Sequence, residues 1–250
     1  MKFLVIGDSC VDVFVYGTAN RLCPDAPVPV FLSVNEIRNG GMASNVYNNI
    51  KSLGGDVDII SNDNIVTKTR YIDKATNQMI MRLDSDIGKS NRIKDIESIN
   101  FTEYDYVIVS DYNKGFLDYD DIDYICNNHN RVFIDTKKII KDRFRRAFCI
   151  KINEIEYNNN LNVGHDITKT HNNVIVTLSS KGCKFNDVIY PVKKVEIKDM
   201  SGAGDTFISG LVTCYANTNN WNNAIEFANK CSTVVVQKRG VSIILPTEIQ

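Results

Sequence analysis

Several features are scarce or missing in this sequence of 250 residues. An excess of one charge is missing, because 29 Lys and Arg stand against 30 Asp and Glu, for a formal net charge of −1. This balance argues against a nucleic-acid binder that relies on overall positive charge. No run approaches the roughly 20 apolar residues of a membrane span, and the apolar N-terminus is too short for a signal peptide. We therefore expect no nucleic-acid partner, no membrane and a cytoplasmic protein.

Paired cysteine motifs and both common nucleotide loops are also missing. The seven cysteines are scattered and never form a Cys-x-x-Cys pair, which argues against a disulfide framework or a zinc site and favours reduced thiols. His129, His165 and His171 lie in different surroundings, so we expect three surface histidines and no metal triad. Neither Gly-x-x-x-x-Gly-Lys-Ser/Thr nor a Gly-x-Gly-x-x-Gly after the first apolar run occurs.

The residues that are present describe an ordinary globular protein, with 43% hydrophobic and 24% charged residues. Short runs rich in Val and Ile alternate with segments of helical period. This alternation predicts an α/β fold with a mostly parallel sheet between helices. The predicted strands are residues 3–6, 106–110, 132–135, 148–152 and 174–178, and the predicted helices are residues 43–53, 119–128, 205–216 and 221–239.

Two segments, residues 13–39 and 66–84, have no helical period and predict a small antiparallel sheet, or lid, over one edge of the main sheet. The Asn-rich run 157–162 predicts a solvated loop. No repeat and no long linker is found, so we expect a single domain over residues 1–250. Ligands of parallel sheets bind beyond the carboxyl ends of the strands. The polar residues expected there are Asp8, Asp111, Asp135, Asn153 and Ser179.

The most informative segment is residues 199–207, in which two glycines precede an apolar stretch with helical spacing. A turn of this kind leaves free N–H groups at the positive end of a helix dipole, where an anion can bind. Glycine lacks the Cβ that would keep a phosphate away. Asp205 falls in the first turn, beside the anion, although a carboxylate there could equally cap the helix.

This segment resembles the C-terminal signature of the ribokinase-like (PfkB) carbohydrate kinases. The resemblance implies an ATP-dependent sugar kinase with a three-layer α/β sandwich, a mostly parallel central sheet and a small antiparallel lid. In that family the Asp takes the proton of the acceptor hydroxyl, and the glycine amides form an anion hole for the transferred phosphoryl group. Such chemistry depends on positioning and charge stabilisation. The implied catalytic residues are Gly202, Ala203, Gly204 and Asp205.

Three further motifs follow the family pattern in chain order. Residues 40–45 resemble its N-terminal diglycine signature, where glycines admit the sugar. Residues 153–156 resemble its Asn-x-x-Glu motif, which orders water around Mg²⁺ and the ATP phosphates. Residues 177–182 resemble its strand-end turn against the nucleotide. The resemblance therefore implies ATP and Mg²⁺, with Asn153 and Glu156 holding Mg²⁺ through water. The implied nucleotide contacts are Asn153, Glu156, Thr177, Ser179, Lys181, Gly182 and Asn229.

Within the family, residues 22–30, 68–70, 81–84 and 110–115 resemble the heptose 7-phosphate kinases. The resemblance implies phosphorylation of D-glycero-D-manno-heptose 7-phosphate at its anomeric oxygen. Hydroxyls of a sugar need short polar side chains, and a phosphate needs cations. The implied substrate contacts are Asp8, Asp12, Gly40, Gly41, Asn45, Arg70, Asp111 and Lys114.

Structural roles compete with two of these interpretations, since Asp8 could cap a turn and Arg82, a weaker candidate, could pair with Asp84. Between residues 53 and 67 the chain is short, where relatives carry a further strand–helix unit, and part of the sheet edge and of the sugar pocket is expected to be missing. Heptose kinases often continue into a nucleotidyltransferase domain, whose pattern we do not find. The resemblance also implies a homodimer through the lid and leaves room for a monovalent cation beside Asp199 and Ser201.

Three alternatives stay open. The chain could be a ribokinase-like kinase for another sugar, sugar phosphate or nucleoside. It could be a kinase-like protein that binds a sugar or nucleotide without turnover, against which the intact motifs argue. A dinucleotide-binding oxidoreductase would fit the strand–helix alternation but lacks its glycine fingerprint.

Overall fold

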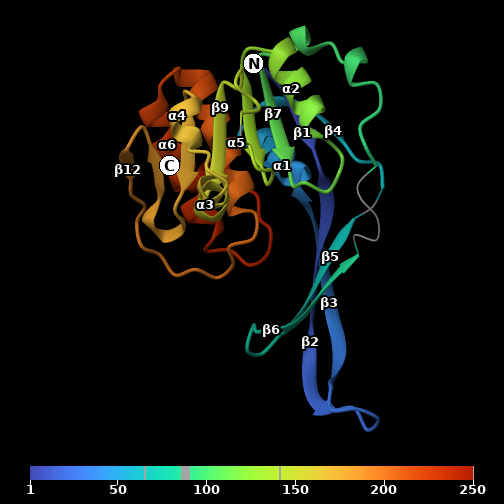
Figure 1. Cartoon of the computed structure of the whole chain (residues 1–250). Helices are drawn as coiled ribbons and strands as arrows, with labels where there is room; N and C mark the ends of the chain where they lie inside the picture. The colour runs from blue at the N-terminus through green and yellow to red at the C-terminus, as the bar shows by residue number, and fades with distance from the viewer. Residues whose placement is uncertain (65, 86–90, 141, 250) are drawn as a thin grey trace.

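The computed structural model describes residues 1–64, 66–85, 91–140 and 142–249. Within these ranges, a sheet of eight strands forms the body of the protein in the order β12-β11-β10-β9-β8-β7-β1-β4 (Figure 1). The pairings from β4 to β10 are parallel, and β11 and β12 extend the sheet antiparallel. The strands are β1 (Lys2–Gly7), β4 (Asp56–Ser61), β7 (Tyr106–Asp111), β8 (Val132–Thr136), β9 (Cys149–Asn153), β10 (Val174–Thr177), β11 (Cys183–Phe185) and β12 (Val188–Tyr190).

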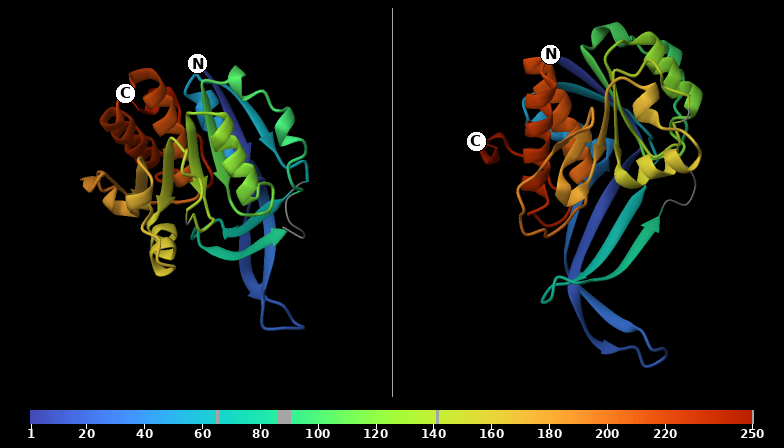
Figure 2. Two further views of the ribbon diagram at one scale, coloured as in Figure 1. Left: turned by 45° about the horizontal axis from the view of Figure 1, so that its top comes forward. Right: turned by 60° about the vertical axis from the view of Figure 1, so that its left-hand side comes forward.

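Helices cover both faces of this sheet (Figure 2). Val5, Ile108 and Phe133 point to one face and pack with the first, fifth and sixth helices, while Leu4 and Val107 point to the other. Strands that are apolar on both faces are thus buried on both faces, and the predicted three-layer α/β sandwich is confirmed. The helices are α1 (Ala43–Ser52), α5 (Ala203–Thr218) and α6 (Trp221–Val235) on the first face, and α2 (Tyr119–Asn128), α3 (Glu154–Asn162) and α4 (Ile167–Thr170) on the second. Short 3₁₀ turns span Ile96–Ser98, Phe101–Glu103, Ser179–Lys181 and Pro246–Glu248.

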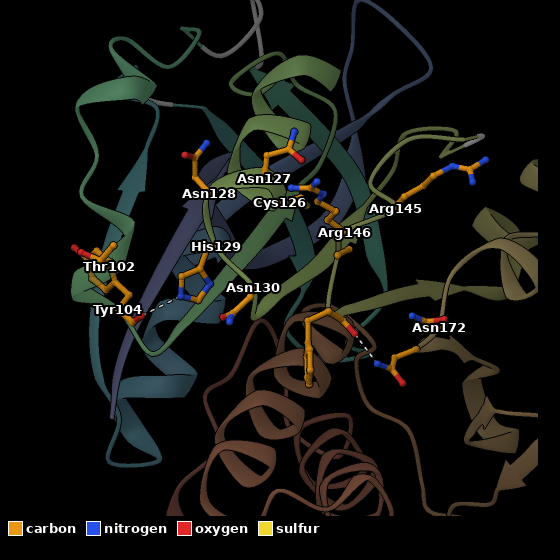
Figure 3. Close-up of a pocket in the computed structure, with 13 residues that line it drawn as sticks. Thr102, Tyr104, Cys126, Asn127, Asn128, His129, Asn130, Arg145, Arg146 and Asn172 are labelled. Carbon is orange, nitrogen blue, oxygen red and sulfur yellow. Dashed lines mark hydrogen bonds between the residues drawn. The ribbon is translucent and has the colours of Figure 1, made fainter.

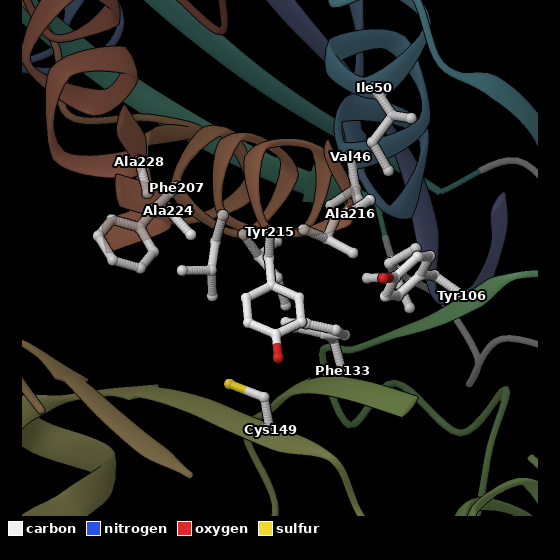
Figure 4. Packing of buried hydrophobic residues seen from close by; sticks show 14 of the residues in the cluster. Val46, Ile50, Tyr106, Phe133, Cys149, Phe207, Tyr215, Ala216, Ala224 and Ala228 are labelled. Atoms are coloured by element: carbon white, nitrogen blue, oxygen red, sulfur yellow. The ribbon is translucent and has the colours of Figure 1, made fainter. Parts of the chain in front are cut away.

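Aromatic side chains fill the core between β8 and the C-terminal helices (Figure 4). The ring of Phe133 is fully buried and lies 6.1 Å, centroid to centroid, from each of Tyr106, Tyr215 and Trp221. Phe148 completes the group at 5.5 Å. This packing fixes α5 against the sheet, and α5 is the helix that begins at the glycine motif.

The second sheet is the predicted lid, and it projects from the body (Figure 1). Its order is β3-β2-β5-β6. The structure differs from the prediction in one pairing, because β2 and β5 are parallel while the other two pairings are antiparallel. The chain passes through α1 and β4 between the two strands, so β5 enters the lid in the same direction as β2. The strands are β2 (Ser9–Leu22), β3 (Pro29–Met42), β5 (Thr67–Asp73) and β6 (Met79–Ser85).

The prediction of a solvated loop at residues 157–162 is wrong, because α3 runs through them. Asparagine disfavours helix interiors since its side chain competes for backbone groups. Here a tertiary contact overrides that tendency: Asn160 is fully buried, and its Oδ1 accepts the Ile140 N–H at 2.8 Å. A capping box between Asn153 and Glu156 starts the helix.

The expectation that His171 lies at the surface is also wrong. Its side chain is 7% exposed, and its Nε2 lies 2.8 Å from the Arg143 carbonyl oxygen, so it joins the end of α4 to the preceding loop. All seven cysteines are free thiols in the structure. In the part of the chain that the structure describes, no helix has the length and apolar character to cross a bilayer.

Replacing Phe133 by Ala tests the aromatic core. We expect the free energy of unfolding to fall by about 3–5 kcal/mol, because the ring leaves a cavity between β8 and α5 that the surroundings only partly refill. Equilibrium unfolding in urea measures the change. Ile155→Ala is the control, since that side chain on α3 is 71% exposed, and its loss is expected to change stability by less than about 0.5 kcal/mol. Equal effects of the two substitutions would contradict this account of the core.

Candidate active site

The candidate site lies where the carboxyl ends of the parallel strands, the start of α5 and the lid meet. Asp205 stands in the first turn of α5, and its side chain is almost fully buried. The Tyr112 hydroxyl donates to its Oδ1 at 2.7 Å, and the Asn45 amide donates to its Oδ2 at 3.1 Å. The structure therefore brings together Asn45 from α1, Asp205 from α5 and Tyr112 from the loop after β7.

Burial raises the pKa of Asp205 from its ordinary value to about 6. The hydrogen bonds from Tyr112 and Asn45 and the nearby Lys151 ammonium act in the opposite direction, and the Asp135 carboxylate adds to the rise. Tyr112 keeps its proton, because burial and the adjacent Asp205 raise the pKa of its phenol well above the ordinary value. A carboxylate with a pKa near neutrality can accept a proton from a bound hydroxyl group.

The glycines before Asp205 leave room for close neighbours. Gly202 precedes the helix with φ 80°, and a Cβ on it would lie 2.6 Å from the Asn45 amide nitrogen. A Cβ on Gly204 would lie 2.9 Å from the Lys151 ammonium nitrogen. The N-terminal N–H groups of α5 are of the kind that helices leave without helical partners, so an anion can bind there. Ala203 lies between the two glycines, and its carbonyl accepts the Ser232 hydroxyl at 3.0 Å.

On the lid side, Asp12 and Arg70 form a buried ion pair between β2 and β5, with Oδ1 and Nη1 2.5 Å apart. Gly41 lies against this pair, since a Cβ on it would be 2.0 Å from the second Asp12 oxygen. A Cβ on Gly40 would meet the Ser44 side chain at 2.9 Å. We refer to Asp12, Arg70, Gly40 and Gly41 as the polar wall, and its two glycines lie five and four residues before Asn45 in the chain.

Two aspartates predicted as substrate contacts have their hydrogen bonds within the protein. Asp8 accepts the backbone N–H groups of Tyr112, Lys114 and Phe116 at 2.9–3.2 Å, and so shapes the loop that carries Tyr112. Asp111 is buried and forms an ion pair with Lys138 at 2.7 Å. Lys114 is half-buried in the same loop.

Arg82 lies farther out on β6, where it forms two 2.7 Å hydrogen bonds with Asp84. Both side chains are partly exposed. This is the structural alternative that the sequence left open for Arg82.

The predicted nucleotide side is built from three elements. Asn153 and Glu156 bond to one another at the start of α3, and the Lys137 ammonium contacts the Glu156 carboxylate. A Cβ on Gly182 would lie 2.0 Å from the Tyr190 carbonyl oxygen, which also accepts the Asn229 amide at 3.0 Å. The 177–182 turn and α6 thus meet at the end of β12. Thr177 is half-buried, and Ser179 and Lys181 are exposed.

Sequence reasoning missed three side chains at this site, Tyr112, Lys137 and Lys151. It expected Asp135 at the end of a strand but gave it no role. Two ammonium groups lie near the Tyr112 ring, with Lys68 Nζ 5.3 Å and Lys137 Nζ 5.2 Å from its centroid. Tyr112 stood inside a motif used for the family resemblance but was not named. Lys151 had a signal of its own, since a lysine in the middle of an otherwise apolar strand needs a partner.

Two cavities lie outside the immediate surroundings of Asp205. One of about 820 Å³ opens at the amino-terminal ends of β8 and β9, and Figure 3 shows His129, Arg145 and Arg146 around it. No residue of the predicted site lines it. The other, of about 150 Å³, lies between the lid and the turn after α6. Its lining includes the cations Arg70, Lys198 and Arg239.

Comparisons with known proteins show the family of the chain. A profile of the pfkB family carbohydrate kinases matches residues 118–248. The chain is 31% identical to the protein named "Bifunctional protein HldE" of Helicobacter pylori (strain J99 / ATCC 700824), over 99% of this chain and 65% of that protein. It is also 31% identical to the HldE protein of Aliarcobacter butzleri (strain RM4018), over 99% and 63%. The chain thus spans about two thirds or less of these relatives, and the first alignment runs over 305 positions.

Solved structures share the fold. A ribokinase from Thermotoga maritima superimposes with a TM-score of 0.76 at 16% identity, over 99% of this chain and 97% of that one. The phosphofructokinase-2 of Escherichia coli, solved in complex with potassium, gives 0.76 at 12% identity, over 99% and 96%. The Arabidopsis thaliana ribokinase, complexed with ribose and ATP, gives 0.72 at 12% identity, over 99% and 97%.

Replacing Tyr112 by Phe tests the environment of Asp205. We expect the pKa of Asp205, about 6 in the unmodified protein, to rise in the variant, because a hydrogen bond that stabilises the carboxylate is lost. Carbon-detected NMR titration of labelled aspartate carboxyl groups measures it. Tyr119→Phe is the control, since that hydroxyl donates to the Ile139 carbonyl instead. An Asp205 pKa that stays the same in Tyr112→Phe would contradict the bond.

Proposed function

Because the chain belongs to the pfkB family of carbohydrate kinases, we propose that it transfers the γ-phosphate of ATP to the anomeric hydroxyl of D-glycero-D-manno-heptose 7-phosphate. The observation that carries the proposal is the buried Asp205 carboxylate beside the N-terminus of α5. A proton acceptor and an anion site are thereby adjacent, as attack of a hydroxyl on a phosphoryl group requires.

The proposed reaction is an in-line displacement. The sugar hydroxyl gives its proton to Asp205 as its oxygen forms a bond to the γ-phosphorus, and the bond from that phosphorus to the β,γ-bridging oxygen breaks. ADP leaves with the bonding electron pair. The N–H groups around Gly202, Ala203 and Gly204 stabilise the charge on the phosphoryl oxygens. Tyr112 and Asn45 orient the Asp205 carboxylate through the hydrogen bonds described above.

The residues present fit ATP with Mg²⁺. Among the described residues no group of three or more His, Cys, Asp or Glu side chains could hold a metal alone. Mg²⁺ at kinase sites is held largely by phosphates and water with one or two carboxylates. Glu156 and Asn153 can hold the water molecules that would surround the ion. When bound, the ion would neutralise charge on the β- and γ-phosphates. We place the rest of ATP along Thr177, Ser179, Lys181, Gly182 and Asn229.

A monovalent cation beside Asp199 fits less well. The two Asp199 oxygens accept the N–H groups of Ser201 at 2.8 Å and Gly240 at 3.1 Å. Lys198 and Arg239 line the same cavity as Asp199. Two positive charges there oppose binding of a third, so we assign no step to a monovalent cation.

Positive charge near the sugar site supports a substrate that already carries a phosphate. Arg70 lies in the polar wall with Asp12 and also lines the 150 Å³ cavity, which Lys198 and Arg239 share. That cavity is large enough for a phosphate group, and guanidinium groups are the preferred partners of phosphate oxygens. We place the sugar hydroxyls against Asp12, Asn45, Gly40 and Gly41, and the distal phosphate against this cavity. Similarity to the HldE proteins supports the choice of a heptose phosphate.

Asp8, Asp111 and Lys114 belong to the proposed site through the loop that follows β7. Asp8 and Asp111 hold the loop that follows β7, as described above, and Lys114 stands in that loop. We propose that Lys114 reaches the substrate from the loop side, opposite the cavity that Arg239 lines.

The lid supports the proposal of a homodimer. Met79, Met81 and Leu83 alternate along β6, and each is about half exposed. Leu32 and Val34 on β3 are 59% and 61% exposed. Exposed apolar rows on a sheet favour association, and we propose a second copy of this chain as the partner.

Release of ADP from Mg·ATP tests the proposed function, with heptose 7-phosphate compared against a panel of sugars, sugar phosphates and nucleosides. We expect turnover with heptose 7-phosphate. Asp205→Asn is expected to lose about 10²–10⁴-fold in kcat, the usual contribution of general-base catalysis, while still binding ATP. Asp187→Asn is the control, because that carboxylate is 94% exposed. Turnover with another acceptor alone would support the kinase assignment and reject heptose 7-phosphate as the substrate. An Asp205→Asn variant that keeps more than about a tenth of the wild-type kcat would exclude Asp205 as the base.

Replacing Arg239 by Ala tests the phosphate site. We expect KM for the phosphorylated sugar to rise about 10-fold or more, because a charge-assisted hydrogen bond is lost, and KM for ATP to change little. The matched control is Arg145→Ala near the amino-terminal ends of β8 and β9, where Arg145 forms an exposed ion pair with Asp142. Steady-state kinetics measures both constants, and a parallel rise of the two KM values in Arg239→Ala would count against the assignment.

A further inference from the structure

Two buried lysine–aspartate pairs stand at the carboxyl ends of the central strands, and they differ in how fully their polar atoms are used. Lys138 donates to Asp111 at 2.7 Å and also to the Leu117 carbonyl at 2.9 Å. Asp111 additionally accepts the Thr136 hydroxyl and the Asn113 N–H. Every oxygen of the Asp111 carboxylate has a protein partner, as expected of a pair that serves the fold.

The second pair joins Lys151 on β9 to Asp135 on β8, at directly paired positions and 2.7 Å apart. Their side chains are 3% and 4% exposed. Among the described residues, the Lys151 ammonium makes no hydrogen bond other than this one, although it carries three donors. The Asp135 Oδ1 is buried, and it has no hydrogen-bond partner in the part of the chain that the structure describes. A buried charge with unused hydrogen-bonding capacity is costly.

The unused donors of Lys151 lie beside the start of α5. The side chain rises from the face of the sheet on which α5 packs, as Cys149 does two residues earlier on the same strand. Its nitrogen lies 2.9 Å from the position that a Cβ on Gly204 would occupy. The Cβ of an alanine at position 204 would contact the ammonium group. With glycine at this position, the ammonium group can lie close to the N-terminus of α5.

From this arrangement we propose that Lys151 is a catalytic residue that donates hydrogen bonds to the γ-phosphoryl oxygens, with Asp135 as the positioning residue that holds its ammonium group. The assignment rests on the proposed kinase function and adds a fixed positive charge to the neutral N–H groups of α5.

The role of Lys151 in the transfer is electrostatic. The acceptor oxygen bonds to the γ-phosphorus as the bridge to the β-phosphate breaks, and the acceptor proton moves to Asp205. Negative charge stays on the three equatorial oxygens throughout, and an ammonium group beside them stabilises it. Lys151 forms and breaks no covalent bond in this step. Asp135, 2.7 Å from the ammonium nitrogen, keeps that positive charge in a buried position.

The test replaces the pair as a unit. Lys151→Met alone leaves the Asp135 charge unpaired and can destabilise the fold, so Lys151→Met/Asp135→Asn is made beside it, since neutral groups of similar size often replace a buried pair without loss of stability. Lys2→Met/Asp58→Asn, which removes an ion pair between β1 and β4 outside the proposed site, is the control for loss of a lysine–aspartate pair. Urea unfolding is measured for each variant.

Two readouts follow for the folded variants. The first is the ratio of affinities for β,γ-imido-ATP and ADP by calorimetry, which needs no sugar. We expect the Lys151 variants to lose about 10-fold or more of the preference for the triphosphate, and the Lys2/Asp58 control to keep it. The second is kcat, which we expect to fall about 10²–10³-fold in the Lys151 double variant, with KM for the sugar little changed.

The outcomes separate this inference from the proposed function. If the unmodified protein turns over and the folded double variant keeps kcat within about threefold, Lys151 is not catalytic and the kinase assignment survives. If the unmodified protein turns over no acceptor, the proposed function fails, and the triphosphate preference still decides whether Lys151 contacts the γ-phosphate. A preference unchanged in the double variant overturns the inference in either case, as does an unmodified protein without such a preference.

Discussion

The site depends on the burial of one carboxylate. Withdrawing Asp205 from water raises its pKa from 3.8 to about 6, which corresponds to roughly 3 kcal/mol against the charged form. A carboxyl group with a raised pKa stabilises the folded state below about pH 4, and this contribution is lost as the pH rises through about 6. At neutral pH the charged group therefore reduces stability. Donors from Tyr112 and Asn45, which lie 93 and 160 residues away in the chain, hold it in place.

Polar residues around the site divide into two groups according to the partners of their hydrogen bonds. Asp8 and Asp111 bond to backbone and side chains of the protein, so they shape the loop after β7. Asp205 stands in the first turn of α5 and Lys151 lies beside Gly204 of the same turn, and both retain hydrogen-bonding capacity for a ligand. Position after a strand predicts that a residue is near the site, but it cannot separate these groups, because the partners that decide come from distant segments.

The same distinction marks what the sequence could predict. The central strands were predictable because they carry apolar residues on both faces of the sheet, such as Val107 on one face and Phe133 on the other. The turn before α5 was predictable because glycine and a helical period are local signals. The Asn-rich helix α3 was not, since it depends on the contact of Asn160 with the loop at Ile140. The parallel pairing of β2 with β5 depends on the route of the chain through α1 and β4. Lys151 lacked a motif, and only the structure shows that its nitrogen lies 2.9 Å from where a Cβ on Gly204 would stand.

The two glycines of the motif exclude a Cβ for different physical reasons. Gly202 has a positive φ that side chains rarely adopt, and it lies against the Asn45 amide that also bonds to Asp205. Gly204 has no such backbone requirement, and what a side chain would meet there is the Lys151 ammonium group. The first glycine thus lies against the amide that orients Asp205, and the second lies against a positive charge. The motif is therefore constrained by the groups behind the helix start as well as by the anion that we propose in front of it.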